Sequence, residues 1–144
     1  MKKSILFLAF VSILVLTSCN CAKNQKTSNA LFSSTWELDY ISGPRIAFEG
    51  LFPENKPQIT FESNGKASGT SSCNGFSTTF THTENTIKIE EPGAMTMRYC
   101  EGGGEQVFLQ TMKKVNKYAV SSDGKLNLMI DDVPFMRFKP VAKK

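Results

Sequence analysis

Histidine is nearly absent from this chain, since His82 is the only one among its 144 residues. A Ser-His-Asp triad or a histidine-rich metal site therefore has little to draw on, and we expect His82 to lie at an exposed strand end. No two cysteines stand in C-x-x-C spacing, which argues against a zinc site or a thioredoxin-like centre. We expect a non-enzymatic protein with no catalytic residue, no metal and no cofactor.

An apolar run of about 20 residues, the length that a membrane-spanning helix needs, is also missing. The apolar stretch over residues 5–16 is shorter and follows two lysines, which is the pattern of a secretory signal. Residues 16–19 read Leu-Thr-Ser-Cys and resemble the bacterial lipobox, in which a leucine and two small residues precede the cysteine that receives lipid. We expect cleavage after residue 18 and attachment of Cys19 to the membrane through palmitate-type acyl chains.

The segment that follows Cys19 is polar over residues 20–29 and offers almost nothing to bury. Asn20 differs from the acidic residue that retains lipoproteins in the inner membrane of enteric bacteria, which favours the outer membrane, with the domain facing the periplasm. The predicted organisation is a signal peptide over residues 1–18, a flexible lipid tether over 19–32, one domain over 33–141 and a short tail over 142–144.

The chain has no large excess of charge of either sign, since its formal net charge is only +4. That balance is too weak to argue for nucleic acid, and we assign the lysines to solvated faces, with anionic lipid headgroups as the alternative. Neighbours on a strand point to opposite faces, so we assign the pairs Glu90-Glu91 and Asp131-Asp132 to turns and edges. We expect a monomer whose partners are the membrane and an unknown envelope protein or an apolar small ligand.

Alternating apolar and polar residues predict a series of short strands. In the first, Trp36, Leu38 and Tyr40 alternate with two acidic residues. Asn64-Gly65 follows a strand over residues 58–62 and predicts a hairpin, because both residues accept positive φ. Further strands are expected at residues 66–72, 76–80, 86–90, 95–97, 118–120, 126–130 and 135–138.

The period changes to that of a helix after the glycine run 102–104. From Glu105 onward, Phe108, Met112 and Val115 recur at i, i+4 and i+7, which is the spacing of one helical face. The glycine run is expected to form a loop, since no Walker lysine follows it to complete a phosphate site. We predict an α+β fold in which a curved antiparallel, barrel-like β-sheet packs around a single long helix.

Two of the four cysteines lie inside the expected domain. Disulfides persist in exported proteins, so Cys73 and Cys100 are the natural pair, with Cys19 assigned to lipid and the role of Cys21 left open. The alternative is that Cys73 is the nucleophile of a cysteine enzyme, which would need a nearby histidine and electropositive surroundings.

A long apolar loop is the candidate site for contact with a ligand or partner. Its large side chains are Ile46, Phe48, Leu51 and Phe52. They either pack over one end of the barrel or remain available at the surface.

A second candidate is a methionine pair. Met95 and Met97 are expected to face the same way on one strand. Core packing against the helix is the favoured role, and binding of Cu(I), which prefers thioethers, is the alternative.

Several short motifs occur in the order of a known family. They are Trp36-Glu37-Leu38, Pro57-Gln58-Ile59-Thr60-Phe61, Gly65, Gly69, Cys73-Asn74, Thr96 and Cys100 at T-x-x-x-C spacing, the helix from Glu105 to Tyr118, and Leu126-Asn127-Leu128. The whole resembles a META domain, of the HslJ-like heat-shock protein family, over about residues 33–141. One departure is that Thr78 and Thr79 stand where the family usually has a glycine before the aromatic at Phe80.

The resemblance implies an antiparallel, barrel-like sheet around one helix. The family is found in bacterial envelopes and is linked to heat shock and antibiotic tolerance, with no enzymatic activity established, so we expect a binding or stress-protection module of the envelope. Its fold is also similar to that of lipid-binding pilot lipoproteins. The alternative function is therefore a lipid- or peptide-binding pilot or chaperone-like protein of a secretion or assembly system.

Overall fold

Nine strands form one antiparallel sheet in the computed structural model, which describes residues 30–142. The predicted signal peptide, Cys19, Cys21 and residues 143–144 lie outside the described residues. The strand order is β5-β4-β3-β2-β1-β9-β8-β7, and β6 pairs with β4. The bounds are β1 Thr35–Ile41, β2 Gln58–Phe61, β3 Lys66–Thr70, β4 Gly75–His82, β5 Ile87–Ile89, β6 Ala94–Met95, β7 Lys117–Val120, β8 Leu126–Ile130 and β9 Val133–Val141.

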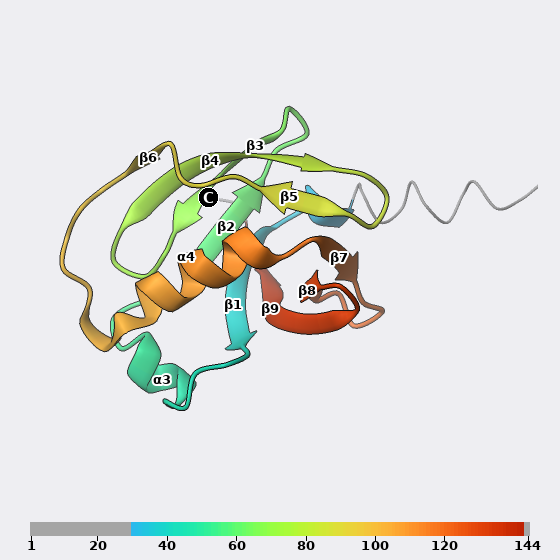
Figure 1. The fold of residues 1–144 in the computed structure, drawn as a ribbon. Helices are drawn as coiled ribbons and strands as arrows, with labels where there is room; N and C mark the ends of the chain where they lie inside the picture. Colours follow the sequence, from blue (N-terminus) through green and yellow to red (C-terminus); the bar gives the residue numbers. More distant parts are fainter. Residues whose placement is uncertain (1–29, 143–144) are drawn as a thin grey trace, which may run out of the picture.

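The sheet curls until its two edge strands approach each other (Figure 1). Two backbone hydrogen bonds join the edges, from Ile87 N to Asn116 O at 3.0 Å and from Tyr118 N to Asn85 O at 2.9 Å. These bonds satisfy backbone groups that an open edge would leave exposed. The predicted α+β class with a curved antiparallel sheet is confirmed.

Alternate side chains of the strands point into the curl and form the core. The buried residues from the strands include Trp36, Leu38, Ile59, Phe61, Phe76, Phe80, Ile87, Ile89, Tyr118, Leu126, Leu128, Met136 and Phe138. Most of them occupy the apolar positions that the sequence pattern predicts.

The folded domain begins earlier than predicted. Leu31 is fully buried and its carbonyl accepts a hydrogen bond from Trp36 Nε1 at 2.8 Å. Phe32 packs beside Phe80 and His82. The prediction of a tether through residue 32 is therefore wrong at its C-terminal end, because these apolar side chains belong to the core.

Helix α4, Gly104–Lys114, packs against the inside of the curl. The ring of Phe108 lies 6.1 Å from that of Phe76 on β4 and 6.5 Å from that of Phe138 on β9. Met112 and Val115 are buried as predicted, although Val115 follows the last helical turn with an extended backbone.

The expected single long helix is wrong in length and number. Helix α4 has 11 residues, a 3-10 turn (η1, Glu101–Gly103) precedes it, and a short helix (α3, Phe48–Leu51) packs against that turn. A Cβ atom at Gly102 would lie 2.4 Å from the carbonyl oxygen of Gly50, and one at Gly104 would lie 2.2 Å from that of Leu51. The glycine run is thus a point of close backbone contact as well as a connection.

A β-bulge changes which side chains of β1 face the core. The pairing with β9 shifts between Leu38 and Tyr40, so that Asp39 is an extra residue on β1. Ile41 is therefore buried, whereas Tyr40 is 42% exposed and lies under the guanidinium of Arg137. The alternation of Trp36, Leu38 and Tyr40 in the sequence therefore breaks at the bulge, and Tyr40 does not share the buried face of the other two.

The predicted hairpin at Asn64-Gly65 is confirmed, with a different turn from the one expected. Gly65 has φ of +81°, and Asn64 is not among the described residues with positive φ. Asn64 instead uses its side-chain oxygen to accept the backbone N–H of Lys66 at 3.0 Å. Asn-Gly thus forms a turn in which only the glycine needs the left-handed conformation.

Candidate functional site

A disulfide bond joins Cys73 to Cys100, with the two α-carbons 5.7 Å apart. Cys73 lies in the turn between β3 and β4, and Cys100 lies directly before η1. The expected pairing of the two domain cysteines is therefore what the structure contains. A disulfide sulfur has no thiolate, so Cys73 in this state cannot act as a nucleophile.

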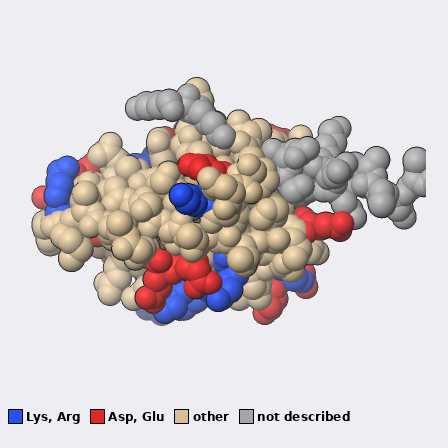
Figure 2. Space-filling view, turned by 90° about the horizontal axis from the view of Figure 1, so that it is seen from above, with Lys and Arg blue, Asp and Glu red and all other residues tan. Residues whose placement is uncertain are grey.

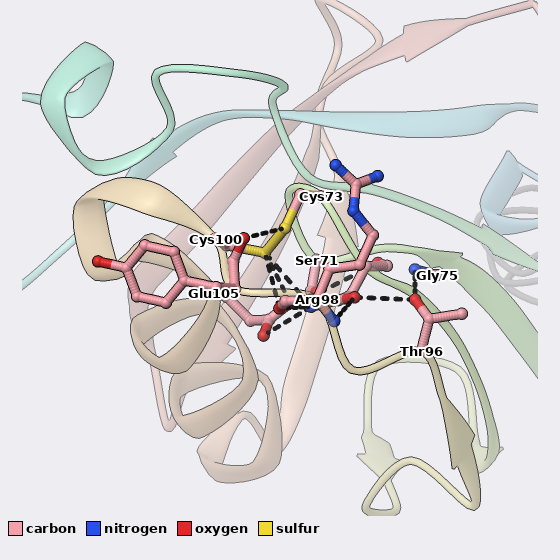
Figure 3. The surroundings of a disulfide bond; sticks show 9 residues. Ser71, Cys73, Gly75, Thr96, Arg98, Cys100 and Glu105 are labelled. Carbon is pink, nitrogen blue, oxygen red and sulfur yellow. Dashed lines mark hydrogen bonds between the residues drawn. A yellow bond between two sulfur atoms is a disulfide. The ribbon is translucent and has the colours of Figure 1, made fainter.

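Asn74, which is fully buried, fixes the backbone of the segment that leads to Cys100. Figure 3 labels its partners Thr96, Arg98 and Glu105. Asn74 Oδ1 accepts hydrogen bonds from the Arg98 backbone N–H at 2.8 Å and from the Thr96 hydroxyl at 2.9 Å. Its Nδ2 donates to the Arg98 carbonyl at 2.8 Å. Since oxygen can only accept and the amide nitrogen only donate, these partners settle the orientation of the amide group.

Glu105 connects the same cluster to helix α4. Both of its carboxylate oxygens lie within hydrogen-bond distance of Asn74 Nδ2, at 3.1 and 3.0 Å, and the Ser71 hydroxyl donates to Oε2. Glu105 stands in the first turn of α4, where a negative charge interacts favourably with the helix dipole. The arrangement joins the β3–β4 turn, residues 96–100 and the helix into one hydrogen-bonded unit.

Residues 96–100 are here called the stapled loop. Three consecutive side chains of this loop point into solvent. Met97 is 91% exposed and Tyr99 is 87% exposed, and Arg98 between them is also exposed. Met97 and Tyr99 are the two most exposed large hydrophobic side chains among the described residues, and they flank Arg98 on a backbone that is held in place. This makes the loop the candidate recognition surface.

The methionine pair does not face one way on a strand. Met95 belongs to β6 and is partly buried against the core, whereas Met97 lies beyond the end of β6. The chain leaves the strand at Thr96, whose hydroxyl accepts the Gly75 N–H and donates to Asn74. The expected same-face arrangement is wrong, and it was the basis of the copper alternative.

The apolar loop largely takes the packing role that was one of its two interpretations. Leu51 and Phe52 are 3% and 4% exposed, and Phe48 packs partly buried with its ring 5.2 Å from that of Phe52. Ile46 alone remains open, at 59% exposed. Of the four predicted contact residues, only Ile46 is well placed to meet a ligand or partner.

A shallow groove runs between the outer side of α4 and the end of the β8–β9 hairpin. Val107, Ile130 and Phe135 are its apolar side chains, and Gln110, Thr111 and Lys114 form its polar rim together with the loop of residues 42–44. An apolar floor with a few polar groups at the edge is typical of small-ligand sites.

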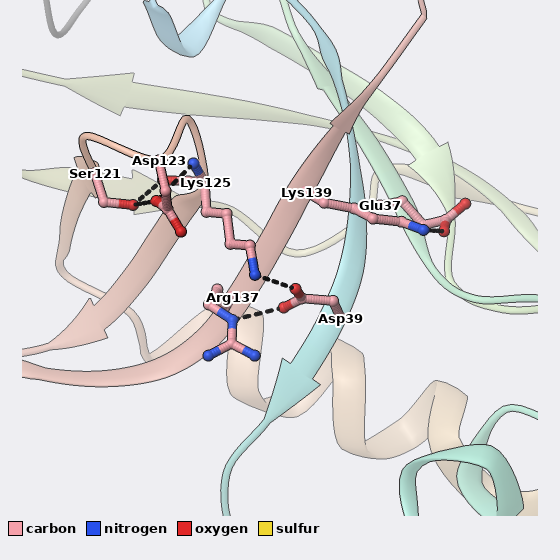
Figure 4. A network of polar contacts seen from close by, with 7 residues as sticks. All are labelled: Glu37, Asp39, Ser121, Asp123, Lys125, Arg137 and Lys139. Carbon is pink, nitrogen blue, oxygen red and sulfur yellow. Dashed lines mark hydrogen bonds and ion pairs between the residues drawn. The ribbon is translucent and has the colours of Figure 1, made fainter.

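The outer face of β1 and β9 holds a charged network instead of a binding site (Figure 4). Asp39 pairs with Arg137 at 2.8 Å and with Lys125 at 3.2 Å, and Glu37 pairs with Lys139 at 3.0 Å. Burial raises the pKa of Glu37, but hydrogen bonds from Lys139 and Gln58, with the charge of Lys139, outweigh it, so the pKa lies below its ordinary value. Because these acidic and basic side chains neutralise one another, this face offers little net charge to attract a ligand.

Charges of both signs also lie close together on the face shown in Figure 2, and much of the surface between them is uncharged. No continuous basic patch is visible on the described part of that face. Both partners of the pair between Glu91 and Lys113 are mostly exposed, so it contributes little to stability.

His82 ends β4 with a half-buried ring that contacts aromatic neighbours. Asp131 and Asp132 occupy a turn, as expected for this acidic pair, and Asp132 pairs with Lys117 at 2.7 Å. Within residues 30–142, no three His, Cys, Asp or Glu side chains gather in a way that could hold a metal. Among the same residues, no helix is long and apolar enough to cross a membrane.

Four residues of this site have no role predicted from the sequence, and two of them, the exposed Arg98 and Tyr99, are not named there at all. Asn74 and Glu105 were noted as parts of motifs, but nothing in their spacing of 31 residues indicates that their side chains meet. The alternation of Met97 with Met95 matches the strand period and predicts a strand, but β6 ends at Met95, and the next residues bond to Asn74 instead.

Comparison with known proteins agrees with this architecture. No curated protein matches the chain significantly. The solved NMR structure of a protein from Burkholderia xenovorans is similar, with a TM-score of 0.58 at 20% sequence identity, over 86% of this chain and 90% of that one, which shows a shared fold. The profile of the META domain matches residues 29–142, which include the whole curled sheet and both cysteines of the disulfide. The chain therefore belongs to the META domain family.

Proposed function

We propose that this META-domain protein is a lipid-anchored, non-enzymatic binding module of the bacterial envelope that protects the envelope under stress. It would sit on the outer membrane and face the periplasm. The anchor rests on the lipobox at residues 16–19, and the choice of membrane rests on Asn20. The stress role rests on the family resemblance alone.

The observation that supports binding is the stapled loop. Met97 and Tyr99 are almost fully exposed, while the backbone between them is bonded on both sides of Arg98 to buried Asn74. A surface that is already ordered pays little conformational entropy when it binds. An exposed apolar pair is costly in water, so retaining it on a rigid support favours an intermolecular role over a structural one.

The non-enzymatic character is supported by the chemistry of the same cluster. Both sulfurs are bonded to each other, and the Glu105 carboxylate already accepts from Asn74 and Ser71. The groups that would have to act as nucleophile and base are therefore engaged in holding the loop. Nucleophilic catalysis would require an activated group with a base within reach.

The test of binding places a photoreactive benzophenone amino acid at Tyr99 of the full-length protein in the cells that make it. Irradiation should give a discrete protein adduct. The same probe at Ser121, an exposed turn residue away from the loop, is the matched control. Equal labelling from both positions, or none from position 99, would contradict a binding role for the loop.

The test of the anchor is Cys19→Ser. Because the lipid is attached through that thiol, the variant should no longer be lipidated or matured, and mass spectrometry should find no diacylglyceryl mass. Cys21→Ser is the control and should mature normally, since Cys19 and Asn20 precede it where small residues are needed. A cleaved Cys19→Ser protein in the detergent phase would show that another feature holds it.

A second candidate function is supported by the groove beside α4. Its floor of Val107, Ile130 and Phe135 suits an apolar chain, which fits the lipid- or peptide-binding alternative. Native mass spectrometry of protein purified from its own cells should then show a co-purified lipid or peptide. Thr111→Trp, which would fill the groove, should remove that mass, and Ser121→Trp should not.

A further inference from the structure

We infer that the stapled loop docks onto a protein surface in which an acidic side chain lies between apolar pockets, and that it faces away from the membrane holding the anchor. The inference rests on the proposed binding function and specifies the partner's chemistry and direction. It follows from the charge, the order and the position of three consecutive residues.

The charge of the loop is available for a partner. Arg98 is exposed, its backbone N–H and carbonyl are bonded to Asn74, and no described residue forms an ion pair or hydrogen bond with its guanidinium. In Figure 3 the Arg98 side chain points away from the hydrogen-bonded cluster. A free guanidinium on a fixed backbone matches the two oxygens of a carboxylate.

The apolar neighbours of Arg98 define the rest of the partner. Met97 and Tyr99 flank it and are 91% and 87% exposed. Methionine, arginine and tyrosine are enriched at protein interfaces, and arginine and tyrosine are among the usual hot-spot residues. Three such side chains in a row predict a partner with two apolar pockets and a carboxylate between them.

The loop is positioned at the opposite end of β4 from the entry of the chain. Gly75 begins β4 and bonds to Thr96 of the loop, whereas His82 ends β4 and its ring lies 5.4 Å from that of Phe32. Eight residues of strand span about 23 Å at roughly 3.3 Å per residue. Figure 1 shows the loop between β6 and α4 on the side of the domain away from the blue start of the described chain.

This position favours a protein over the anchoring bilayer. The lipid is expected on Cys19, and the described chain begins next to Phe32, at the end of β4 opposite the loop. A polybasic segment is the usual signal for an anionic membrane surface, and here one cation is followed closely by the exposed acidic residue Glu101. Insertion into lipid is therefore the competing outcome of the test.

The first experiment uses the full-length protein with the photoreactive probe at Tyr99. Arg98→Glu should lower the adduct yield about tenfold or more, because it places like charges opposite each other in the interface. Arg45→Glu is the matched control, since Arg45 is exposed and also lacks an ion pair within the described residues. It should leave the yield unchanged.

The outcomes separate the inference from the proposed function. An adduct that survives Arg98→Glu at full yield overturns the acidic partner but leaves binding by the loop in place. Loss of the adduct in both arginine variants overturns the specific role of Arg98. An adduct that never forms from position 99 overturns binding itself.

The second experiment measures direction. Tyr99→Trp gives an exposed tryptophan, while the native Trp36 is 1% exposed and protected from quenchers in water. In vesicles of phosphatidylethanolamine and phosphatidylglycerol, acrylamide should quench the lipidated variant and brominated lipid should not. Quenching by brominated lipid would show that the loop enters the bilayer and would overturn the inference.

Discussion

The side-chain amide of Asn74 lies 3.0 Å from Oε2 of Glu105, although the two residues are 31 positions apart. Asn74 ends a hairpin turn and Glu105 stands in the first turn of helix α4, so this contact joins the two segments beside the disulfide. Asn74 also holds the stapled loop, through the Thr96 hydroxyl and the Arg98 backbone. The conformation of the loop is held by these bonds, by the pairing of Thr96 with Gly75 and by the disulfide.

Asn74→Ala should destabilise the domain by about 3 kcal/mol. The Arg98 backbone N–H would lose its buried acceptor, and the Glu105 carboxylate would lose its buried donor. Urea unfolding monitored by Trp36 fluorescence measures the change. Thr79→Ala, on the exposed side of the same strand, is the control and should stay within about 0.5 kcal/mol of the parent. A similar effect of both variants would mean that Asn74 is not the centre of the cluster.

Replacing Cys73 and Cys100 together by serine should cost about 3.5 kcal/mol in the chain-entropy account, given their sequence separation of 27. The double variant and its parent should be compared as secreted proteins in which Cys19 and Cys21 are also replaced. Mass spectrometry of the alkylated, non-reduced parent should show one linked pair of peptides. Two alkylated thiols in protein from an oxidising compartment would contradict the disulfide and reopen Cys73 as a reactive residue.

Phe108→Ala should cost about 3–5 kcal/mol, because the ring fills the space between β4 and β9. The shift of the denaturant midpoint measures the loss. Gln110→Ala, at an exposed position of the same helix, should change the midpoint little. An unaltered midpoint for Phe108→Ala would show that the helix does not pack as described.

The domain should lose stability in acid through Glu37. Although burial raises its pKa, the hydrogen bonds from Lys139 and Gln58 lower it by more, so the folded-state pKa lies below the unfolded value. The stabilisation is therefore complete above about pH 4.5, near the unfolded pKa, and is lost as the pH falls toward the folded pKa.

Glu37→Gln should flatten this part of the stability profile, measured by urea unfolding between about pH 2.5 and 6. Glu54→Gln, in an exposed loop, should leave the slope as it is in the parent. An unchanged slope in Glu37→Gln would assign the acid sensitivity to other carboxylates.

The strands could be predicted from the sequence because each follows the two-residue period of a half-buried sheet, as Leu126 and Leu128 do. The bulge at Asp39 could not, because an extra residue is defined only by its partner strand. Helix α4 was recognisable from Phe108 and Met112. The four-residue helix α3 is too short to show a period of its own.

The candidate site was only partly accessible from sequence. The pairing of Cys73 with Cys100 followed from the count of cysteines and the expected export. The role of Asn74 did not, since a buried amide that bonds another segment leaves no periodic signal. The apolar residues of the 46–52 loop were a natural candidate for binding, but Leu51 and Phe52 pack over the helix start at Gly104, which only the folded chain reveals.

Three consecutive glycines lie where η1 meets α4, and the three positions should differ in which substitutions they tolerate. Carbonyl oxygens of α3 lie so close to positions 102 and 104 that any side chain there would collide with backbone. At Gly103, by contrast, nothing lies within 4 Å of a Cβ. Gly103 has φ of +70°, a conformation that asparagine tolerates best after glycine. A library randomised over this run and selected for folding should keep glycine at its two ends and accept asparagine in the middle.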